Sequence, residues 1–566
     1  MAEDAPDAVA IGIAHAFAPA FRCAREGRMN ARETRVRGSK IQRIRRYWRG
    51  KVEKHLCDRG LVSERAWKAM FVQLASDVAF AAAEIGRIGE ATEDVGFDPR
   101  EPLVWAWCVL DTMPGDHDQR YQRLRERTAS GTGIEDRADT IRQHGYAMAG
   151  LPSAIELQVP WLAALARALD DELAALQYWP EDVSEWCEDD WRPPGYECFV
   201  VPVRREHRLA DGRPVQRRGL LHHAVMPSRV GSLRVELHLH PDAPNRELEV
   251  DPENWVFGCA TFPGMTVVPL ETAGDGFLLT AAPLSDEAAV VANQVAGART
   301  AEADVAIWPE LTMPPDRLTL ITELLSADPL AGGRIPLVVA GSWHVTRPPD
   351  EPGVADADVD ANATVTTEAE ADVRSDAEES VADDPEGFGD AECSESSESS
   401  EGSEGSEGDA EADRHVNRSH VMLGHGEPFL TYDKRRRFPY QHLTEDIRTG
   451  RSLPVIVMEN RLVGIAICRD NCDDNAKEGY GALPLDLLIV PSMGAESTVM
   501  AHQRHAQGQR SRQGTVTVVV QQGLAVDGSP PPPGPQAYSF VWPDSDGRPA
   551  SPQAEAFRTL NKETGA

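Results

Sequence analysis

Three short stretches of this chain place chemically capable side chains at the ends of strand-like segments. The first ends at Glu310 in Ile-Trp-Pro-Glu, the second ends at Lys434 in Tyr-Asp-Lys, and the third carries Cys468 in Gly-Ile-Ala-Ile-Cys-Arg-Asp. In chain order they supply a carboxylate, an ammonium and a thiol. Such a set can hydrolyse a carbon–nitrogen bond through a thioester, because the thiol attacks, the carboxylate moves protons and the ammonium stabilises an oxyanion.

These motifs resemble those of the nitrilase or carbon–nitrogen hydrolase superfamily, which carries Glu, Lys and Cys in this order. In that family the glutamate follows a proline at a strand end, the lysine lies in Tyr-x-Lys, and the cysteine ends a buried strand and precedes x-Asp. All three contexts are present here, and the 34 residues from Lys434 to Cys468 are a typical spacing. The resemblance covers residues 250–550. It implies an α/β fold, a four-layer α-β-β-α sandwich, that assembles into homodimers or larger homo-oligomers.

The resemblance also implies a role for each residue. Glu310 is the general base, and partial burial should bring its pKa towards neutrality. Lys434 stabilises the tetrahedral intermediate together with the backbone N–H of Arg469. A nearby ammonium should lower the pKa of the Cys468 thiol to roughly 3.5–7.5, and the polar residues that follow it favour exposure. A second acidic residue supports the lysine, for which Glu445 is the first candidate and Glu459 the second.

Two departures from the family pattern leave the substrate class open. The family often has Arg-Ala-x-Glu-Asn where this chain has Arg-Ser-Arg-Gln-Gly at residues 510–514, so the acidic residue and the asparagine are missing. Arg469 also stands where an aromatic or acidic residue is common after the cysteine. The sequence therefore does not decide between an amide, a nitrile and a carbamoyl substrate.

The net charge of −34 is concentrated in one segment. Residues 350–413 contain 24 acidic residues and the single basic residue Arg374, a net −23, which leaves −11 for the rest of the chain. The globular part is therefore only mildly acidic, and the whole-chain charge gives no indication of nucleic-acid binding. Because this Ser/Glu/Asp/Gly/Ala-rich segment cannot bury much apolar surface, we expect residues 350–414 to form a disordered insert.

Other features suggest a cytoplasmic protein without a cofactor. No apolar run reaches the length of a membrane span, and the first residues are acidic rather than signal-like. The nine cysteines are odd in number and scattered, so neither a disulfide framework nor a CxxC metal pattern is present. Cys472, His502 and His505 could be imagined around a metal ion, but their spacing is poor, and we expect no metal site.

Residues 1–235 are expected to form an N-terminal region of unknown role, helical first and then partly β. Apolar residues at spacings of three and four predict a helix that buries Ile41, Ile44, Trp48, Val52 and Leu56. Ser63 is a candidate N-cap of a second helix. Residues 198–203 and 233–237 are strand candidates.

Residues 250–550 alternate between strand and helix patterns. Short runs rich in Val and Ile predict central strands that are covered on both faces. A helix is expected over residues 285–300, with Ser285 as its N-cap. The strands are expected at residues 255–258, 305–308, 336–341, 455–458, 462–467, 485–490 and 515–520.

The best interpretation of the sequence is a carbon–nitrogen hydrolase of amidase or nitrilase type, with an amide favoured over a nitrile. One alternative is a catalytically inactive nitrilase-like binding or regulatory protein. Another is a nucleic-acid-associated bacterial defence protein that uses the basic helix around Arg43, Arg45, Arg46, Arg49 and Lys51, although a solvated helix face is the simpler interpretation of that helix. We expect a small-molecule amide or nitrile as substrate and no membrane or nucleic-acid partner.

Overall fold

The computed structural model describes most of the chain outside its acidic segment. The described residues are 31–58, 62–85, 97–114, 132–144, 146, 155–176, 186–203, 220–241, 255–272, 275–327, 335–346, 415–440, 442–458, 461–472, 479–526 and 537–542. The insert expected at residues 350–414 and the candidate Glu459 lie outside them. Among the described helices, none is both long enough and apolar enough to cross a membrane.

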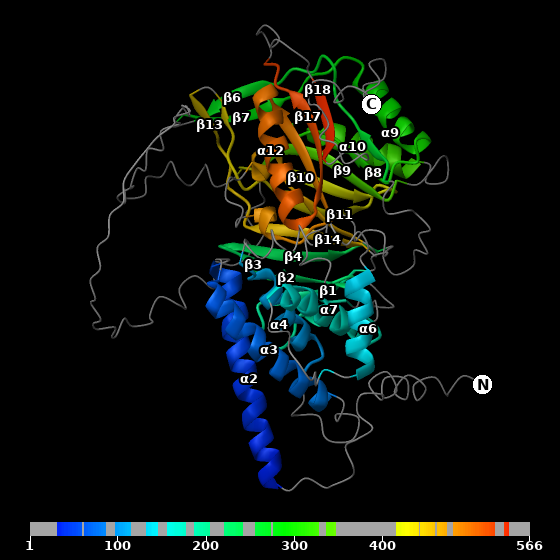
Figure 1. Cartoon of the computed structure of the whole chain (residues 1–566). Helices are drawn as coiled ribbons and strands as arrows, with labels where there is room; N and C mark the ends of the chain where they lie inside the picture. Colours follow the sequence, from blue (N-terminus) through cyan, green and yellow to red (C-terminus); the bar gives the residue numbers. More distant parts are fainter. Residues whose placement is uncertain are drawn as a thin grey trace, which may run out of the picture.

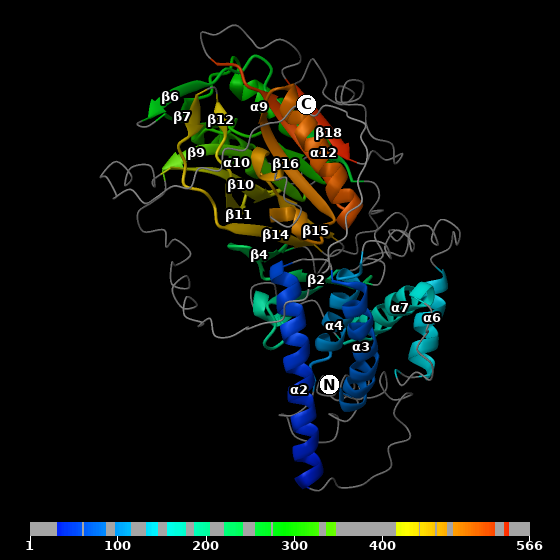
Figure 2. The ribbon, with the colours of Figure 1, turned by 60° about the vertical axis from the view of Figure 1, so that its left-hand side comes forward.

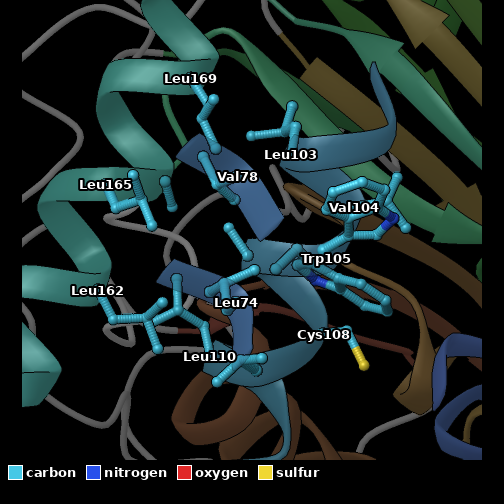
Figure 3. Packing of buried hydrophobic residues seen from close by; sticks show 14 of the residues in the cluster. Leu74, Val78, Leu103, Val104, Trp105, Cys108, Leu110, Leu162, Leu165 and Leu169 are labelled. Carbon is cyan, nitrogen blue, oxygen red and sulfur yellow. The ribbon is translucent and has the colours of Figure 1, made fainter. Parts of the chain in front are cut away.

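The N-terminal part is a group of helices packed around an apolar core. The helices are α2 (Ala31–Asp58), α3 (Glu64–Ile85), α4 (Arg100–Asp111), α6 (Thr132–His144) and α7 (Ile155–Ala174), followed by the short 3-10 helix η3 (Glu188–Trp191). All five apolar residues of the expected α2 stripe are buried. The Ser63 hydroxyl accepts the Ala66 N–H at 3.4 Å, as an N-cap does. Figure 3 shows α4 packed between α3 and α7 through Leu74, Leu110 and Leu162.

Part of the basic face of α2 is used inside the protein. The Arg45 guanidinium donates to both carboxylate oxygens of the buried Glu101, with Nε at 2.9 and 3.1 Å. Arg49 donates to the Pro194 carbonyl at 2.7 Å. These two arginines are therefore structural, while Arg43 and Arg46 remain exposed.

A two-stranded ribbon connects the helices to the rest of the molecule. It pairs β1 (Cys198–Pro202) with β2 (His223–Pro227) in antiparallel register. Because side chains alternate along a strand, Cys198 and Val200 enter the helical core, whereas Phe199 and Val201 enter the core of the α/β part. In Figures 1 and 2 the ribbon lies between the helices and the larger sheets.

The α/β part contains two large sheets and one small sheet. The first is ordered β18 (Ala537–Trp542), β17 (Val516–Gly523), β16 (Leu487–Gly494), β15 (Arg461–Ile465), β14 (Ser452–Met458), β4 (Leu233–Leu239) and β3 (Arg229–Val230). The second is ordered β11 (Pro428–Asp433), β10 (His415–Leu423), β9 (Leu337–Thr346), β8 (Val305–Ile307) and β5 (Phe257–Cys259). The small sheet is ordered β12 (Pro439–Tyr440), β13 (Leu443–Glu445), β7 (Gly276–Ala281) and β6 (Val268–Thr272).

The two large sheets share one apolar core. Val305 and Ile307 of β8 enter this core, while Ala306 and Trp308 enter a second core with α9 (Glu287–Thr300) and α10 (Pro315–Ala327). Helix α12 (Glu496–Gln513) contacts β16, β17 and β18 of the other large sheet. Two short 3-10 helices, η6 (Cys468–Asn471) and η7 (Gly479–Ala482), follow β15. The α/β fold is thus built from facing sheets with helices against them.

Two sequence-based boundaries differ from the structure. The boundary at residue 235 falls inside β4, which pairs in parallel with β14 through Val235 and Leu453. The large sheet therefore begins before residue 250, because its first strands come from the region assigned to the N-terminal part. Helix α9 begins at Glu287, and Asp286 precedes it in the left-handed region without a capping side-chain bond, so the expected Ser285 cap is wrong.

Candidate active site

Glu310 is held by the segment that leaves β8. The Trp308 N–H donates to the Val339 carbonyl of β9 at 2.9 Å, so strand pairing continues to the residue before Pro309. Gly341 of β9 has φ +68°, and a Cβ there would lie 2.2 Å from the Pro309 carbonyl oxygen. Only glycine therefore lets β9 pass this close. Leu311 follows Glu310 with φ +54°, which a side chain adopts at a cost.

Lys434 follows β11 and stays hydrogen-bonded on both sides of its backbone. Its N–H donates to the Asn417 carbonyl of β10 at 2.9 Å, and its carbonyl accepts the Gly450 N–H at 2.8 Å. The Lys434 side chain is fully buried. Burying an ammonium is costly unless it is paired, so its partners define the site.

Cys468 begins η6 three residues after β15 ends at Ile465. The Ala466 N–H still donates to the Ile489 carbonyl of β16 at 2.9 Å, and the chain turns immediately afterwards. Cys468 has φ +45°, a left-handed conformation that is strained for a residue with a side chain. Such strain is frequent at functional sites. Cys468 is only 1% exposed, so the exposure expected from the sequence is wrong.

The buried ammonium of Lys434 bridges two carboxylates. Its Nζ lies 2.6 Å from Glu310 Oε1 and 2.7 Å from Glu445 Oε2. The structure thus brings Glu310, Lys434 and Glu445 together from three separate segments. Glu445 also accepts the Phe438 N–H at 2.9 Å, which fixes the orientation of its carboxylate.

Two further side chains of the site were missed in the sequence. Asn417 Nδ2 donates to Glu445 Oε1 at 2.8 Å and to Glu310 Oε1 at 3.2 Å. His344 Nε2 lies 2.8 Å from Glu445 Oε1. Asn417 and His344 are direct cross-strand partners on β10 and β9, so their side chains emerge on the same face. No local sequence signal marks Asn417, because the polar residues Arg418, Ser419 and His420 follow it directly.

The tautomer of His344 follows from its two contacts. The Leu279 N–H donates to Nδ1 at 2.7 Å, so that nitrogen carries no proton. Nε2 must then carry the ring proton and donate a hydrogen bond to Glu445. This hydrogen bond leaves Glu445 surrounded by donors and committed to holding Lys434.

The backbone of Met493 connects Glu310 with Cys468. Its N–H donates to Glu310 Oε2 at 3.1 Å, and its carbonyl accepts from the Cys468 thiol at 3.5 Å. Met493 lies near the end of β16, whose neighbour β15 leads into Cys468. Glu310 and the Cys468 thiol are therefore both held by Met493 near the end of β16.

Asp470 ties the cysteine turn to the lysine segment. Its carboxylate accepts the Tyr432 hydroxyl at 2.6 Å and the backbone N–H groups of Arg435 and Arg436 at 3.0 and 2.8 Å. The Arg435 guanidinium returns a bond to the Asp470 carbonyl at 3.0 Å. These contacts explain why a tyrosine before the lysine and an aspartate after the cysteine occur together.

The surroundings of the two carboxylates shift their pKa values in opposite directions. Burial alone would raise the pKa of Glu445, but Lys434 and the hydrogen bond from His344 outweigh it and hold that pKa at about 2. Burial raises the pKa of Glu310, and the opposing pull of Lys434 does not cancel it. One carboxylate is thus a fixed anion, and the other is poised to accept a proton.

The thiol behaves differently from the sequence-based expectation. Burial and then the charge of Glu310 raise the pKa of Cys468 well above its usual value, and Lys434 opposes this shift only in part. The low thiol pKa expected from the sequence is therefore wrong for the resting site, because the ammonium is already neutralised by two carboxylates. The nucleophile needs a base at the moment of attack. The oxyanion role of the Arg469 N–H stays a prediction.

A second buried polar network lies behind the cysteine turn. The ring nitrogens of His502 face Asn471 Nδ2 at 3.0 Å and Ser492 Oγ at 3.0 Å. Cys472 Sγ also lies 3.3 Å from His502 Nδ1. Burial lowers the pKa of His502 to about 3, so the ring is neutral. These hydrogen bonds give His502 a structural role in joining η6 to α12.

The end of α12 explains one departure from the family pattern. Gly514 caps the helix with φ +74°, and its N–H donates to the Arg510 carbonyl. The Arg510 guanidinium in turn donates to the Gly514 carbonyl at 2.7 Å. The glycine therefore closes the helix where the family pattern has an asparagine.

Comparison with known proteins finds similarity only among solved structures. No family model matches the chain, and no curated protein matches it. A mutant of the amidase from Nesterenkonia sp. AN1 is 13% identical with a TM-score of 0.25, over 46% of this chain and 79% of that one. The carbon–nitrogen hydrolase from Helicobacter pylori G27 is 12% identical with a TM-score of 0.27, over 49% and 80%. The C. elegans NitFhit protein is 14% identical with a TM-score of 0.25, over 49% and 55%. The chemistry below rests on the geometry of the site.

Proposed function

We propose that this chain hydrolyses carbon–nitrogen bonds, with an amide favoured over a nitrile, through a thioester on Cys468. The observation that carries the proposal is the buried Lys434 ammonium held between Glu310 and Glu445 beside a strained, buried thiol. Burying three charges and a thiol is expensive for the fold. That cost is understandable where the groups perform chemistry. We also infer that the layers form the four-layer α-β-β-α arrangement of such hydrolases.

In the first half-reaction, Cys468 attacks the amide carbon while Glu310 accepts the thiol proton. The new carbon–sulfur bond places a negative charge on the former carbonyl oxygen, which Lys434 and the Arg469 N–H stabilise. Glu310 then gives its proton to the nitrogen, the carbon–nitrogen bond breaks, and ammonia or an amine leaves. The acyl group remains on the sulfur as a thioester.

In the second half-reaction, water replaces the amine. Glu310, again ionised, removes a proton from water as the oxygen attacks the thioester. The carbon–sulfur bond breaks, the acid leaves, and the thiol regains its proton. Glu445 stays ionised throughout because its pKa of about 2 is far below the working range. Its task is to hold Lys434 in place.

A screen for ammonia release from amides, carbamoyl compounds and nitriles tests the proposal, with Cys468→Ala as the control. We expect release from at least one amide and none from the variant. Intact-mass analysis of the wild-type protein, quenched with acid during turnover, should show the acyl group added to Cys468. If no compound releases ammonia while the protein is folded, the inactive binding-protein interpretation replaces this one.

A further inference from the structure

We propose that the Ser492 hydroxyl donates a hydrogen bond to the Cys468 sulfur whenever that sulfur is negatively charged, and that His502 positions Ser492 for this task. The part of this inference that concerns turnover rests on the proposed function. Ser492 and His502 are both fully buried. Ser492 lies on β16 directly before Met493, whose carbonyl accepts from the Cys468 thiol at 3.5 Å. The hydroxyl and the sulfur therefore meet at the same strand end.

The tautomer of His502 follows from its neighbours. Gln509 Nε2 donates to Asn471 Oδ1 at 3.3 Å, so Asn471 presents its Nδ2 to His502 Nδ1 at 3.0 Å. An amide nitrogen only donates, so His502 Nδ1 accepts and carries no proton. Burial lowers the pKa of His502 to about 3, which leaves the neutral ring with one proton. That proton is on Nε2, and Nε2 donates to Ser492 Oγ at 3.0 Å.

This tautomer decides what the serine can do. Because Nε2 already carries a proton, His502 cannot take the proton of the Ser492 hydroxyl. Ser492 and His502 therefore do not form a serine nucleophile with its base. The hydroxyl accepts from His502 and keeps its own hydrogen to donate elsewhere.

Two acceptors compete for the hydrogen of the Ser492 hydroxyl. Gln521 Nε2 donates to the Ala495 carbonyl at 2.9 Å, so Gln521 Oε1 faces Ser492 Oγ, at 3.2 Å. The other acceptor is the Cys468 sulfur. Burial raises the pKa of Cys468, and a hydrogen bond from Ser492 is among the contacts that oppose this rise.

The charge of the sulfur selects between the two acceptors. A neutral thiol is a weak acceptor, so the hydrogen points to Gln521 in the resting site. A hydrogen bond to an ionised group is roughly twice as strong as one between neutral groups. Once Glu310 has taken the thiol proton, the hydroxyl therefore turns from Gln521 to the Cys468 sulfur.

In the proposed reaction the sulfur becomes negative twice. It does so when Glu310 removes the thiol proton, and again when the carbon–sulfur bond of the second tetrahedral intermediate breaks. Ser492 keeps its proton in both steps, and Glu310 returns the proton to the sulfur at the end. The sulfur of the thioester is uncharged. The hydrogen bond therefore assists both half-reactions without stabilising the thioester between them.

Alkylation of Cys468 by iodoacetamide tests the contact without any substrate. A hydrogen bond to a charged group is typically worth about one to two pKa units, so Ser492→Ala should leave less thiolate at neutral pH. Because a thiolate of higher pKa is also more nucleophilic, we expect its rate to fall by about three- to tenfold rather than by the full change in thiolate. Ser492→Thr keeps the hydroxyl and should stay close to the wild-type rate.

Ser228→Ala is the matched control for the loss of a buried hydroxyl. The Ser228 hydroxyl donates to Glu197 at 2.9 Å between β2 and β3, away from the cysteine. This variant should leave the alkylation rate of Cys468 unchanged. If Ser492 had only a structural role, its loss would loosen the site, expose the buried thiol and speed up alkylation. The direction of the change therefore separates the two roles.

His502→Gln and His502→Leu test the positioning role, and they also serve if Ser492→Ala does not fold. The glutamine amide can still donate to Ser492, whereas leucine offers no donor. We expect the glutamine variant to alkylate at Cys468 close to the wild-type rate and the leucine variant to approach the slower rate of Ser492→Ala. Equal rates in the two variants, or a faster rate in His502→Leu, would show that His502 does not position Ser492.

Turnover and alkylation together separate this inference from the proposed function. With an amide that the wild type hydrolyses, Ser492→Ala should lower kcat about tenfold or more and Ser492→Thr should restore it. If amides are hydrolysed but Ser492→Ala alkylates as fast as the wild type, the function stands and the serine contact is wrong. If alkylation slows as expected but no amide is hydrolysed, the contact stands and the proposed function fails.

Discussion

At the scale of single residues, the site is a balance of buried charges around Lys434. Two carboxylates lie within 2.7 Å of its Nζ, and each also accepts from Asn417 and from a backbone N–H, but Glu445 is bonded to His344 as well and Glu310 is not. This asymmetry makes Glu445 a fixed anion and leaves Glu310 free to exchange a proton. The roles that the sequence assigned to these residues can therefore be tested one by one.

Lys434→Arg should abolish most activity and leave the fold intact. A compact ammonium fits between two carboxylates and an oxyanion, whereas a planar guanidinium is wider and directs its donors in a fixed fork. The loss of one oxyanion donor costs roughly 10²–10³ in kcat. The control is Arg436→Lys, two residues further on at an exposed position, which should change turnover less than about twofold. Near-normal turnover of Lys434→Arg would show that Lys434 is not catalytic.

The pH dependence of turnover should report Glu310. Because Glu310 acts as a base only when it is ionised, activity should be present above its pKa and lost as the pH falls through it. Burial raises this pKa above the ordinary glutamate value of about 4.3, so the acidic limb of kcat/KM should lie at a higher pH than that value. Glu310→Gln should remove the limb and lower the rate roughly 10²–10⁴-fold. Glu427→Gln, at a side chain 65% exposed, is the control.

Thiol alkylation tests whether Glu310 activates the Cys468 thiol. With its pKa raised, Cys468 should react slowly with iodoacetamide at neutral pH unless Glu310 removes the proton. Peptide mapping of the wild type should still find Cys468 labelled before the buried Cys108, whose thiol lies in the apolar helical core. An inert Cys468 in a folded protein contradicts its role as nucleophile.

At the scale of elements, short apolar runs predicted several strands but missed β10, β11, β18 and the small sheet, and no strand's partner could be predicted. Runs of Val and Ile located β8, β9 and β14 to β17 within a few residues, because buried strands need continuous apolar faces. The parallel pairing of β4 with β14 joins residues more than two hundred positions apart. No local pattern encodes such a pair, so the domain boundary was placed too late.

The same limit applies to the site. Glu310, Lys434 and Cys468 could be found because each ends a strand in a recognisable context, and Glu445 was a candidate among two. Asn417 and His344 lie inside strands, and only the β9–β10 register shows that they face the same carboxylate. The burial of the thiol depends on Met493 and on the core shared by the two large sheets, whose strands arrive from elsewhere in the chain.

Gly341→Ala tests how β9 positions Glu310. Gly341 has φ +68°, and the new Cβ would lie 2.2 Å from the Pro309 carbonyl, so the Pro-Glu segment must move. Gly231 is the matched control because it has φ +59° but nothing within 4 Å of the added Cβ. Both alanine variants should lose about 1–2 kcal/mol of stability from backbone strain, and Gly341→Ala should lose more because its Cβ also clashes with a backbone oxygen. Only Gly341→Ala should also lose at least tenfold in kcat/KM, which thermal unfolding and kinetics together will show.

At the scale of the whole molecule, the acidic segment is inserted between β9 and β10, which pair as the two strands of an antiparallel hairpin. Thr346 ends β9, His415 begins β10, and the two are direct cross-strand partners. The chain thus leaves and re-enters the sheet at adjacent positions, which a two-residue turn can join. Replacing residues 347–414 by Asn-Gly should leave the melting temperature within about 5 °C, a shift of the size produced by about 1 kcal/mol or less in a domain. Hydrolysis should change less than about twofold. Loss of soluble protein contradicts this view of the segment as dispensable.

The helical part should not be removable in the same way. A chain that begins at residue 186 would keep the β1–β2 ribbon but expose its outer face, where Cys198, Val200 and Val225 now enter the helical core. Burying each such side chain contributes roughly 1.5–3 kcal/mol, so the loss is on the order of 6 kcal/mol against a typical total of 5–15. The fragment should aggregate on size-exclusion chromatography, while the Asn-Gly variant of the full chain stays soluble. A monodisperse, active fragment would show that the ribbon belongs to the α/β part alone and that the helices are a separate module.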